Sequence, residues 1–169
     1  MKNLLKIFLF LLLIQSCEKE KEISSISAIN WDSRSVGLSK TDSLLHGTTY
    51  LSVYSQIYSL TEHRTHNLTA IVSMRNTNRK DSIYINKAEY FGTNGHHIRT
   101  YFEKTIYIAP METVEIVIDE IDQDGGTGPN FVFEWSISHD VNEPLFEGIM
   151  ISTSGQQGLS FTTQGVRIK

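Results

Sequence analysis

The chain has 169 residues, of which 40% are apolar, 10% aromatic and 20% charged, and it contains one cysteine. This length and composition fit one globular domain with an extension and argue against a disordered chain. The formal net charge is -4, from 15 basic and 19 acidic side chains, and the sequence has no cluster of Lys or Arg. The charge pattern therefore excludes nucleic acid as an expected partner.

Residues 1–17 have the layout of a secretory signal sequence. Lys2 and Lys6 precede an apolar run over residues 7–14, which is shorter than the about 20 residues that span a bilayer. The ending Ile14-Gln15-Ser16-Cys17 resembles the bacterial lipobox, which has an aliphatic residue three positions before the cysteine and a small residue directly before it. We therefore predict that residues 1–16 are a lipoprotein signal peptide and that Cys17 becomes the first mature residue.

A lipidated Cys17 would carry a diacylglyceryl thioether and an N-acyl chain such as palmitate. Two or three acyl chains give effectively permanent anchoring, because each buried methylene contributes about 0.8 kcal/mol. We expect a domain outside the cytoplasm, lipid-anchored to a membrane of the bacterial cell envelope, and to the outer membrane in a Gram-negative cell. The alternative is an ordinary signal peptide with a cysteine nearby by chance, and the lack of any other cysteine argues against it.

Residues 17–45 are predicted to form the lipidated cysteine and a flexible tether. Alternating Glu and Lys at residues 18–22 are followed by seven serines between Ser24 and Ser43, with little apolar periodicity. Such a stretch cannot bury enough surface to offset its ordering entropy, and a flexible chain of this length reaches roughly 30 Å. Trp31 is the exception in this composition, and the sequence leaves open whether it docks on the domain or lies free.

Residues 46–169 are predicted to form the folded domain, because their apolar residues alternate with period two. No segment of the mature chain has a sustained helical stripe. The sequence therefore predicts an all-β domain, a two-layer antiparallel β-sandwich of immunoglobulin-like topology without its disulfide, and a small closed β-barrel is the alternative. We expect Trp135 in the core, since it alternates with Phe131 and Phe133. The expected strands cover residues 50–58, 66–74, 82–91, 97–103, 104–109, 112–118, 130–138, 145–153 and 159–168.

Five blocks of the sequence resemble, in order, a family of bacterial proteins. The blocks are Thr49 to Tyr58, Met74 to Asn78, Gly125 to Phe131, Asn142 to Pro144 and Gly155 to Phe161. On these blocks, the stretch from about Thr48 to Arg167 resembles the family known as domain of unknown function 3124. The resemblance implies a secreted or lipid-anchored bacterial protein, and it carries no activity.

An acidic, glycine-rich stretch supplies the first candidate binding loop. Glu120, Asp122 and Asp124 are followed by glycine, which is the spacing that opens an EF-hand calcium loop. Phe131 replaces the glutamate expected at the twelfth position, so a solvated turn between two strands competes with a metal site. Glycines also allow a ligand to approach the backbone closely. The candidate binding residues are Asp122, Asp124, Gly125, Gly126, Gly128 and Asn130.

Gln156 and Gln157, which lie between two glycines, form the second candidate loop. Their amides could bind a polar ligand, and the alternative is a short hairpin loop without a binding role. Two predicted strands separate this loop from the first one, so both loops are expected at the same end of the sandwich.

The sequence contains no recognisable catalytic constellation. It lacks a Ser or Cys nucleophile in an elbow and a phosphate-binding glycine loop ahead of a helix. We therefore expect no enzyme, and no cofactor other than the calcium considered above. The leading hypothesis is an envelope binding or assembly module that contacts an envelope protein through its loops or a sheet edge. The alternative is an envelope protein that binds calcium or another metal through residues 120–130.

Overall fold

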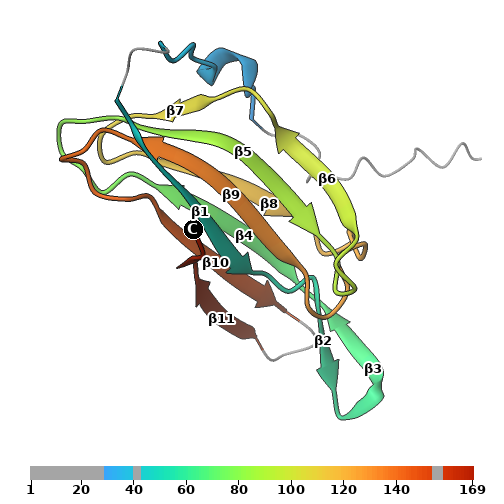
Figure 1. Ribbon diagram of the computed structural model, residues 1–169. Helices are drawn as coiled ribbons and strands as arrows, with labels where there is room; N and C mark the ends of the chain where they lie inside the picture. Colours follow the sequence, from blue (N-terminus) through green and yellow to red (C-terminus); the bar gives the residue numbers. More distant parts are fainter. Residues whose placement is uncertain (1–28, 40–42, 154–157) are drawn as a thin grey trace, which may run out of the picture.

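The computed structural model describes residues 29–39, 43–153 and 158–169, and no helix in these ranges is both long and apolar enough to cross a membrane. The described chain consists of β-strands preceded by a short 3-10 turn, η3 (Asp32–Arg34) (Figure 1). The strands are β1 (Leu45–Ser52), β2 (Gln56–Ser59), β3 (Thr61–Asn67), β4 (Thr69–Arg75), β5 (Ile83–Phe91), β6 (His97–Phe102), β7 (Ile106–Ile108), β8 (Thr113–Ile118), β9 (Asn130–Ile137), β10 (Leu145–Ser152), β11 (Leu159–Gln164) and β12 (Val166–Arg167).

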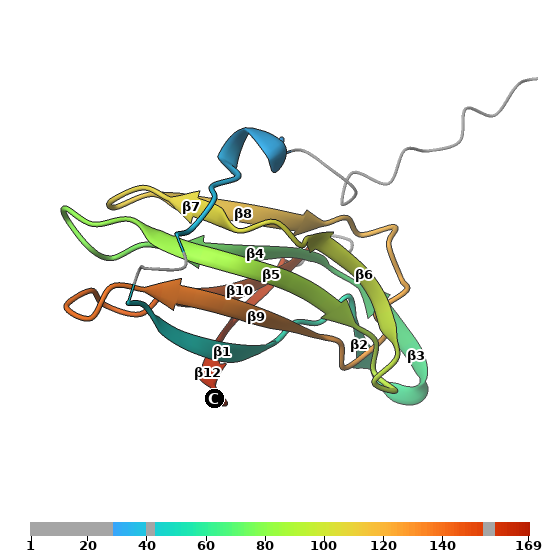
Figure 2. The ribbon, with the colours of Figure 1, turned by 45° about the horizontal axis from the view of Figure 1, so that its top comes forward.

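Two antiparallel sheets pack face to face (Figure 2). One sheet has the strand order β12-β1-β9-β5-β6, with β7 also paired to β5, and the other has the order β11-β10-β4-β8. The pairing of β4 with β8 in one sheet and of β5 with β9 in the other matches the central pairs of immunoglobulin-like domains, whereas β1 pairs with β9 and β10 with β4, which differs from the immunoglobulin order. The prediction of a two-layer β-sandwich is confirmed, and the described strands do not close into a barrel.

Aromatic rings join the two sheets in the core. Phe131 and Phe133 of β9 stack with their centroids 5.5 Å apart, and Phe133 stacks on Phe146 of β10 at 4.3 Å. Trp135 is 1% exposed, and its Nε1 donates a hydrogen bond to Thr49 Oγ1 at 2.9 Å. The prediction that Trp135 belongs to the core is confirmed.

The last predicted strand is divided at Gly165, where the chain passes from one sheet to the other. The segment before this glycine, β11, pairs with β10, whereas the segment after it, β12, pairs with β1. A Cβ atom at Gly165 would lie 2.7 Å from Thr49 Cγ2 and 3.0 Å from Phe146 Cβ. Side chains of both sheets therefore leave room only for glycine at this corner.

Buried asparagines connect the loops at one end of the sandwich. Asn76 Nδ2 donates to the carbonyl oxygens of Ile108 and Ala109, each at 3.0 Å. Asn78 Nδ2 donates to Asn142 O at 3.0 Å, and Asn142 N donates back to Asn78 Oδ1 at 2.8 Å. Two of the five sequence blocks named above therefore meet here, and their contacts stabilise the fold.

The other end of the sandwich carries the β2–β3 hairpin, which projects beyond both sheets (Figure 1). Tyr58 and Leu60 near its turn are 62% and 89% exposed. Residues 29–39 lie far from this hairpin, alongside β7. The described N-terminal segment and the hairpin therefore mark different ends of the molecule.

Candidate functional site

The first candidate loop, residues 119–129 between β8 and β9, is fixed by an ion pair. Asp122 is 2% exposed, and its Oδ2 lies 2.8 Å from Nη2 of Arg99 on β6. Asp124 Oδ2 lies 3.6 Å from the same nitrogen, and Glu120 is exposed. Because β6 and β8 belong to different sheets, the pair joins the two layers at this end.

This geometry gives no support to a calcium site formed by Glu120, Asp122 and Asp124. Within the described ranges, no three His, Cys, Asp or Glu side chains are grouped so that they could hold a metal ion. Asp122 faces the guanidinium of Arg99, whose positive charge would repel a cation bound beside it. The buried ion pair between Asp122 and Arg99 lies where the sequence suggested a calcium site.

The glycines of this loop are engaged by neighbouring connections of the same chain. Gly126 O accepts a hydrogen bond from Ser55 Oγ at 3.0 Å, and Gly125 O accepts one from Thr93 N at 3.0 Å. Gly128 N donates to Thr93 Oγ1 at 2.8 Å. The loop therefore covers the end of the sandwich and is bonded to the β1–β2 and β5–β6 connections.

The remaining candidate residues divide into two groups. Asn130 is the first residue of β9 and is half-buried within the ladder between β1 and β5. Cys17, Gln156 and Gln157 lie outside the described residues. The ends of β8 and β10 both lie beside residues 69–70 of β4, so these two strands end at the same end of their sheet.

Two tyrosines lie against Arg99 at the same end of the molecule. The guanidinium carbon is 5.8 Å from the ring centroid of Tyr90 and 6.0 Å from that of Tyr101, which is within the range of a cation–π contact. Both phenol oxygens are buried from solvent. Burial raises the pKa of both hydroxyls, that of Tyr101 to about 12, so both remain protonated near neutral pH.

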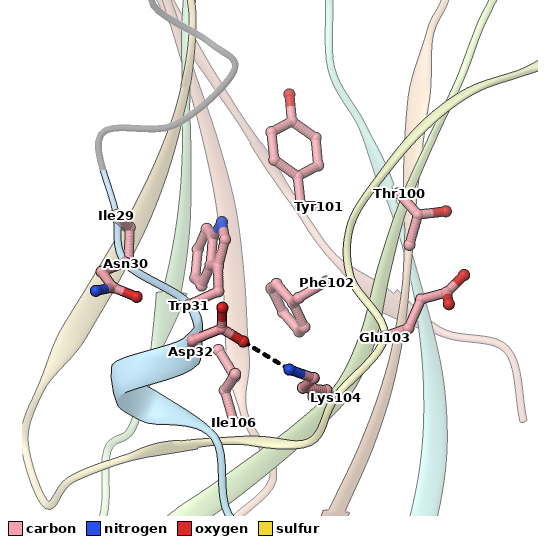
Figure 3. Close-up of a pocket in the computed structure, with 10 residues that line it drawn as sticks. All are labelled: Ile29, Asn30, Trp31, Asp32, Thr100, Tyr101, Phe102, Glu103, Lys104 and Ile106. Atoms are coloured by element: carbon pink, nitrogen blue, oxygen red, sulfur yellow. Dashed lines mark hydrogen bonds and ion pairs between the residues drawn. The ribbon is translucent and has the colours of Figure 1, made fainter.

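A pocket of about 980 Å³ lies between the N-terminal segment and strands β6 and β7 (Figure 3). Residues 29–32 form one wall, and residues 100–104 with Ile106 form the other. Its volume is at the upper end of the about 300–1,000 Å³ that small-molecule sites typically have. We call it the Trp31 pocket.

Trp31 closes one side of this pocket by packing on the domain. Its ring centroid lies 4.7 Å from that of Phe102, with the ring planes tilted by 41°. The chain then continues along β7, where Ser35 forms a β-bridge with Ile106 and Val36 N donates to Thr105 O at 2.9 Å. Of the two alternatives that the sequence left open for Trp31, the structure has the docked one.

Two ion pairs hold the same segment on the sandwich. Arg34 Nη2 lies 2.7 Å from Glu112 Oε1, and Lys104 Nζ lies 2.8 Å from Asp32 Oδ1 at the pocket rim. The hydrogen bond from Arg34 lowers the pKa of Glu112, and the one from Lys104 lowers the pKa of Asp32. Both carboxylates are therefore ionised at neutral pH. The rim pair is largely exposed to solvent, so it orients the side chains more than it stabilises the fold.

The pocket combines an aromatic wall with a polar rim. Trp31 and Tyr101 are half-buried, whereas Phe102 beneath them is 6% exposed. Within the described chain, the indole Nε1 of Trp31 donates to no protein acceptor. Glu103 and Lys104 at the rim are exposed. The site therefore offers flat rings together with separate donors and acceptors.

The family model described as "Protein of unknown function (DUF3124)" matches residues 46–168. The chain belongs to this family. The DUF3124 domain thus extends from β1 to β12, and the segment that contributes Trp31 to the pocket precedes it. No curated protein matches the chain significantly. Among solved proteins, the crystal structure of Thermotoga maritima 1070 is similar over 71% of this chain and 94% of its own, with 10% sequence identity and a TM-score of 0.44.

The sequence of this DUF3124 protein marks Trp31 as unusual but gives no such indication for its partners in the pocket. Phe102 and Lys104 lie about 70 positions away and read as ordinary members of a strand and a turn. The available signal was one tryptophan in a serine-rich stretch, because a large aromatic ring is rarely left without a packing surface. The sequence contained no signal for the pairing of Asp122 with Arg99.

Proposed function

We propose that this protein is a lipid-anchored binding module of the bacterial cell envelope, and that the Trp31 pocket is its ligand site. The observation that carries the proposal is the pocket itself, which a segment outside the DUF3124 domain completes by docking on β6 and β7. Most small-molecule sites are concave, with apolar walls and a few placed polar groups. The Trp31 pocket has this composition.

We prefer the Trp31 pocket to the acidic, glycine-rich loop at residues 119–129, which the sequence favoured as a binding site. Asp122 is committed to an ion pair with Arg99, and the loop glycines are bonded to Ser55 and Thr93. Their chemistry is therefore used inside the protein. The volume beside the docked segment, by contrast, is open and lined by both aromatic and polar residues.

A sheet edge remains the competing surface for partner binding. The outer edge of β8 has no paired strand among the described residues, and Val117 on it is 36% exposed. Such an edge can accept an added strand from a partner. It has only six residues and offers no pocket for side chains, so we rank it second.

Site-specific photocrosslinking in living cells separates these surfaces. A benzophenone amino acid is placed at Glu103 in the pocket, at Val117 on the β8 edge or at Gln123 in the glycine-rich loop. Because benzophenone inserts into C–H bonds of protein and glycan alike, it reports any bound partner within reach. We expect adducts from the Glu103 position and none from the other two. Adducts from Val117 alone would contradict the pocket and favour strand addition.

A further inference from the structure

We infer that the Trp31 pocket binds a saccharide, and this inference rests on the proposed function. The face of a sugar ring presents C–H groups with partial positive charge, whereas its edge presents hydroxyls that donate and accept hydrogen bonds. The faces of aromatic rings carry partial negative charge and attract the C–H groups of the sugar, whereas polar side chains form hydrogen bonds with its hydroxyls. A saccharide site therefore needs flat rings next to a polar rim.

The aromatic part of the pocket meets this requirement. Trp31 lies on Phe102, which is almost fully buried and serves as its support. Tyr101 lines the same volume (Figure 3). Its ring also stacks on Phe131 of the core, with the centroids 5.5 Å apart. Rings held in this way keep their orientation, so a ligand that stacks on them loses little side-chain freedom from the protein.

The polar part of the pocket is neither strongly charged nor apolar. The lining residues include two carboxylates, Asp32 and Glu103, and one ammonium group, Lys104. This balance disfavours a polyanion, because the local charge is slightly negative. A fatty acyl chain is also disfavoured, since it would cover the polar side chains without replacing their hydrogen bonds to water. An uncharged ligand that is rich in hydroxyls satisfies both conditions.

Unused hydrogen-bonding groups agree with this ligand class. The indole N–H of Trp31 has no acceptor among the described residues, and Glu103 in the lining is exposed. Asn30, also in the lining, accepts from Ser33 N at 3.2 Å through Oδ1, which leaves its Nδ2 for a ligand. The lining of the pocket thus contains N–H donors and a carboxylate acceptor in addition to its aromatic rings.

The test uses the full-length chain, purified in a detergent without a sugar headgroup. Three tetrasaccharides serve as probes: chitotetraose, cellotetraose and maltotetraose. We expect at least one to bind, with a saturable change in tryptophan fluorescence and a matching heat signal in calorimetry. Preference for chitotetraose would indicate an amino-sugar glycan such as that of the cell wall, and preference for a glucose oligomer would indicate a neutral glucan.

Variants locate the binding on the molecule. Trp31→Ala should weaken saccharide binding by about tenfold or more, and Trp31→Phe should restore part of it because a flat ring remains. Trp31→Ala also removes the contact with Phe102, so Glu103→Ala supplies a second test that leaves the segment docked, and it should weaken binding several-fold. The matched control is Glu62→Ala, which replaces another exposed glutamate, on the distant β3 strand, and this variant should bind as the wild type does.

Two results would overturn the inference. If none of the three probes bound at about 10 mM, the ligand class would be wrong, whereas adducts at Glu103 in the photocrosslinking experiment would still support the proposed binding module. If a probe bound and both pocket variants retained wild-type affinity, the saccharide site would lie elsewhere.

Discussion

Replacing Gly125 by alanine should destabilise the domain much more than the same change three residues later at Gly128. A Cβ atom on Gly125 would lie 2.0 Å from Tyr90 Oη and 2.8 Å from Pro129 Cγ, and both neighbours are buried. Overpacking of this kind costs about 1–3 kcal/mol. On Gly128 the nearest atom would be Thr93 Cγ2 at 3.5 Å, an ordinary contact. There we expect a change within about 0.5–1 kcal/mol of zero.

Gly126 provides an intermediate case with a different cause. Its φ is +77°, so an alanine there must adopt the left-handed region, at a cost of about 1–2 kcal/mol, and its Cβ atom would also lie 2.9 Å from Thr93 Oγ1. At Gly125 the nearest obstacle is Tyr90 Oη, and removing that atom should relieve the clash. Tyr90→Phe removes that oxygen. The Tyr90→Phe change should therefore rescue Gly125→Ala in part, since Pro129 remains close, and should leave Gly126→Ala unchanged.

Urea denaturation followed by far-ultraviolet circular dichroism measures these free energies of unfolding. The double-mutant cycle of Gly125 and Tyr90 should give a favourable coupling of about 0.5–3 kcal/mol, as contacting residues usually do. If Gly125→Ala were as stable as the wild type, or if the coupling with Tyr90→Phe were zero, the close contact with Tyr90 would not be the reason for a glycine at position 125. The loop would then regain its interest as a ligand site.

Four further predictions concern other parts of the chain. Cys17→Ser should give an unlipidated species that leaves the membrane fraction, and unchanged detergent partitioning would contradict the lipoprotein assignment. Trp135→Ala should cost about 3–5 kcal/mol and lower the melting temperature by at least about 10 °C, because it empties a core site; a melt within a degree or two of wild type would contradict the packing. Arg34 lowers the pKa of Glu112 from its ordinary 4.5, so the ion pair contributes its full stability above pH 4.5 and loses it as the pH falls through the lowered pKa. Trp31 fluorescence should therefore report undocking of the segment in acid. A Glu112→Gln variant should show no such acid transition, because its segment should already be loosened at neutral pH. Because burial raises the pKa of Tyr101 to about 12, its contribution to stability is complete below the ordinary value of 10.0 and is lost as the pH rises towards 12, and alkaline absorbance titration should lose a late component in Tyr101→Phe.

The alternation of apolar residues was enough to predict most strands, because a sheet that packs on one face requires it. Phe131, Phe133 and Trp135 illustrate this, since their spacing alone placed them on the inner face. The break at Gly165 was not predicted, because residues on both sides alternate in the same way and only the pairing partners change. Strand pairing depends on contacts between residues far apart in the sequence, which a local pattern does not record.

The candidate sites show the same limit. Asp122 looked like a metal ligand because its neighbours have calcium-loop spacing, yet Arg99, 23 positions earlier, neutralises it. The glycines predicted as ligand contacts approach Tyr90 and Thr93 instead. The sequence pattern marked Asp122 and these glycines as unusual, but their contacts are with residues that only the folded structure brings close to them.

The docked segment that carries Trp31 also sets a geometric limit on a lipid-anchored protein. If the chain were free from Cys17 to Leu45, 28 residue steps could separate the membrane from β1 by about 100 Å when fully extended. With Ile29 held in the wall of the pocket, only 12 steps remain, which span at most about 43 Å. In a lipid-anchored protein the pocket would then stay within that distance of the bilayer, whereas the β2–β3 hairpin at the other end of the molecule, with Tyr58 and Leu60 exposed, could reach farther from it.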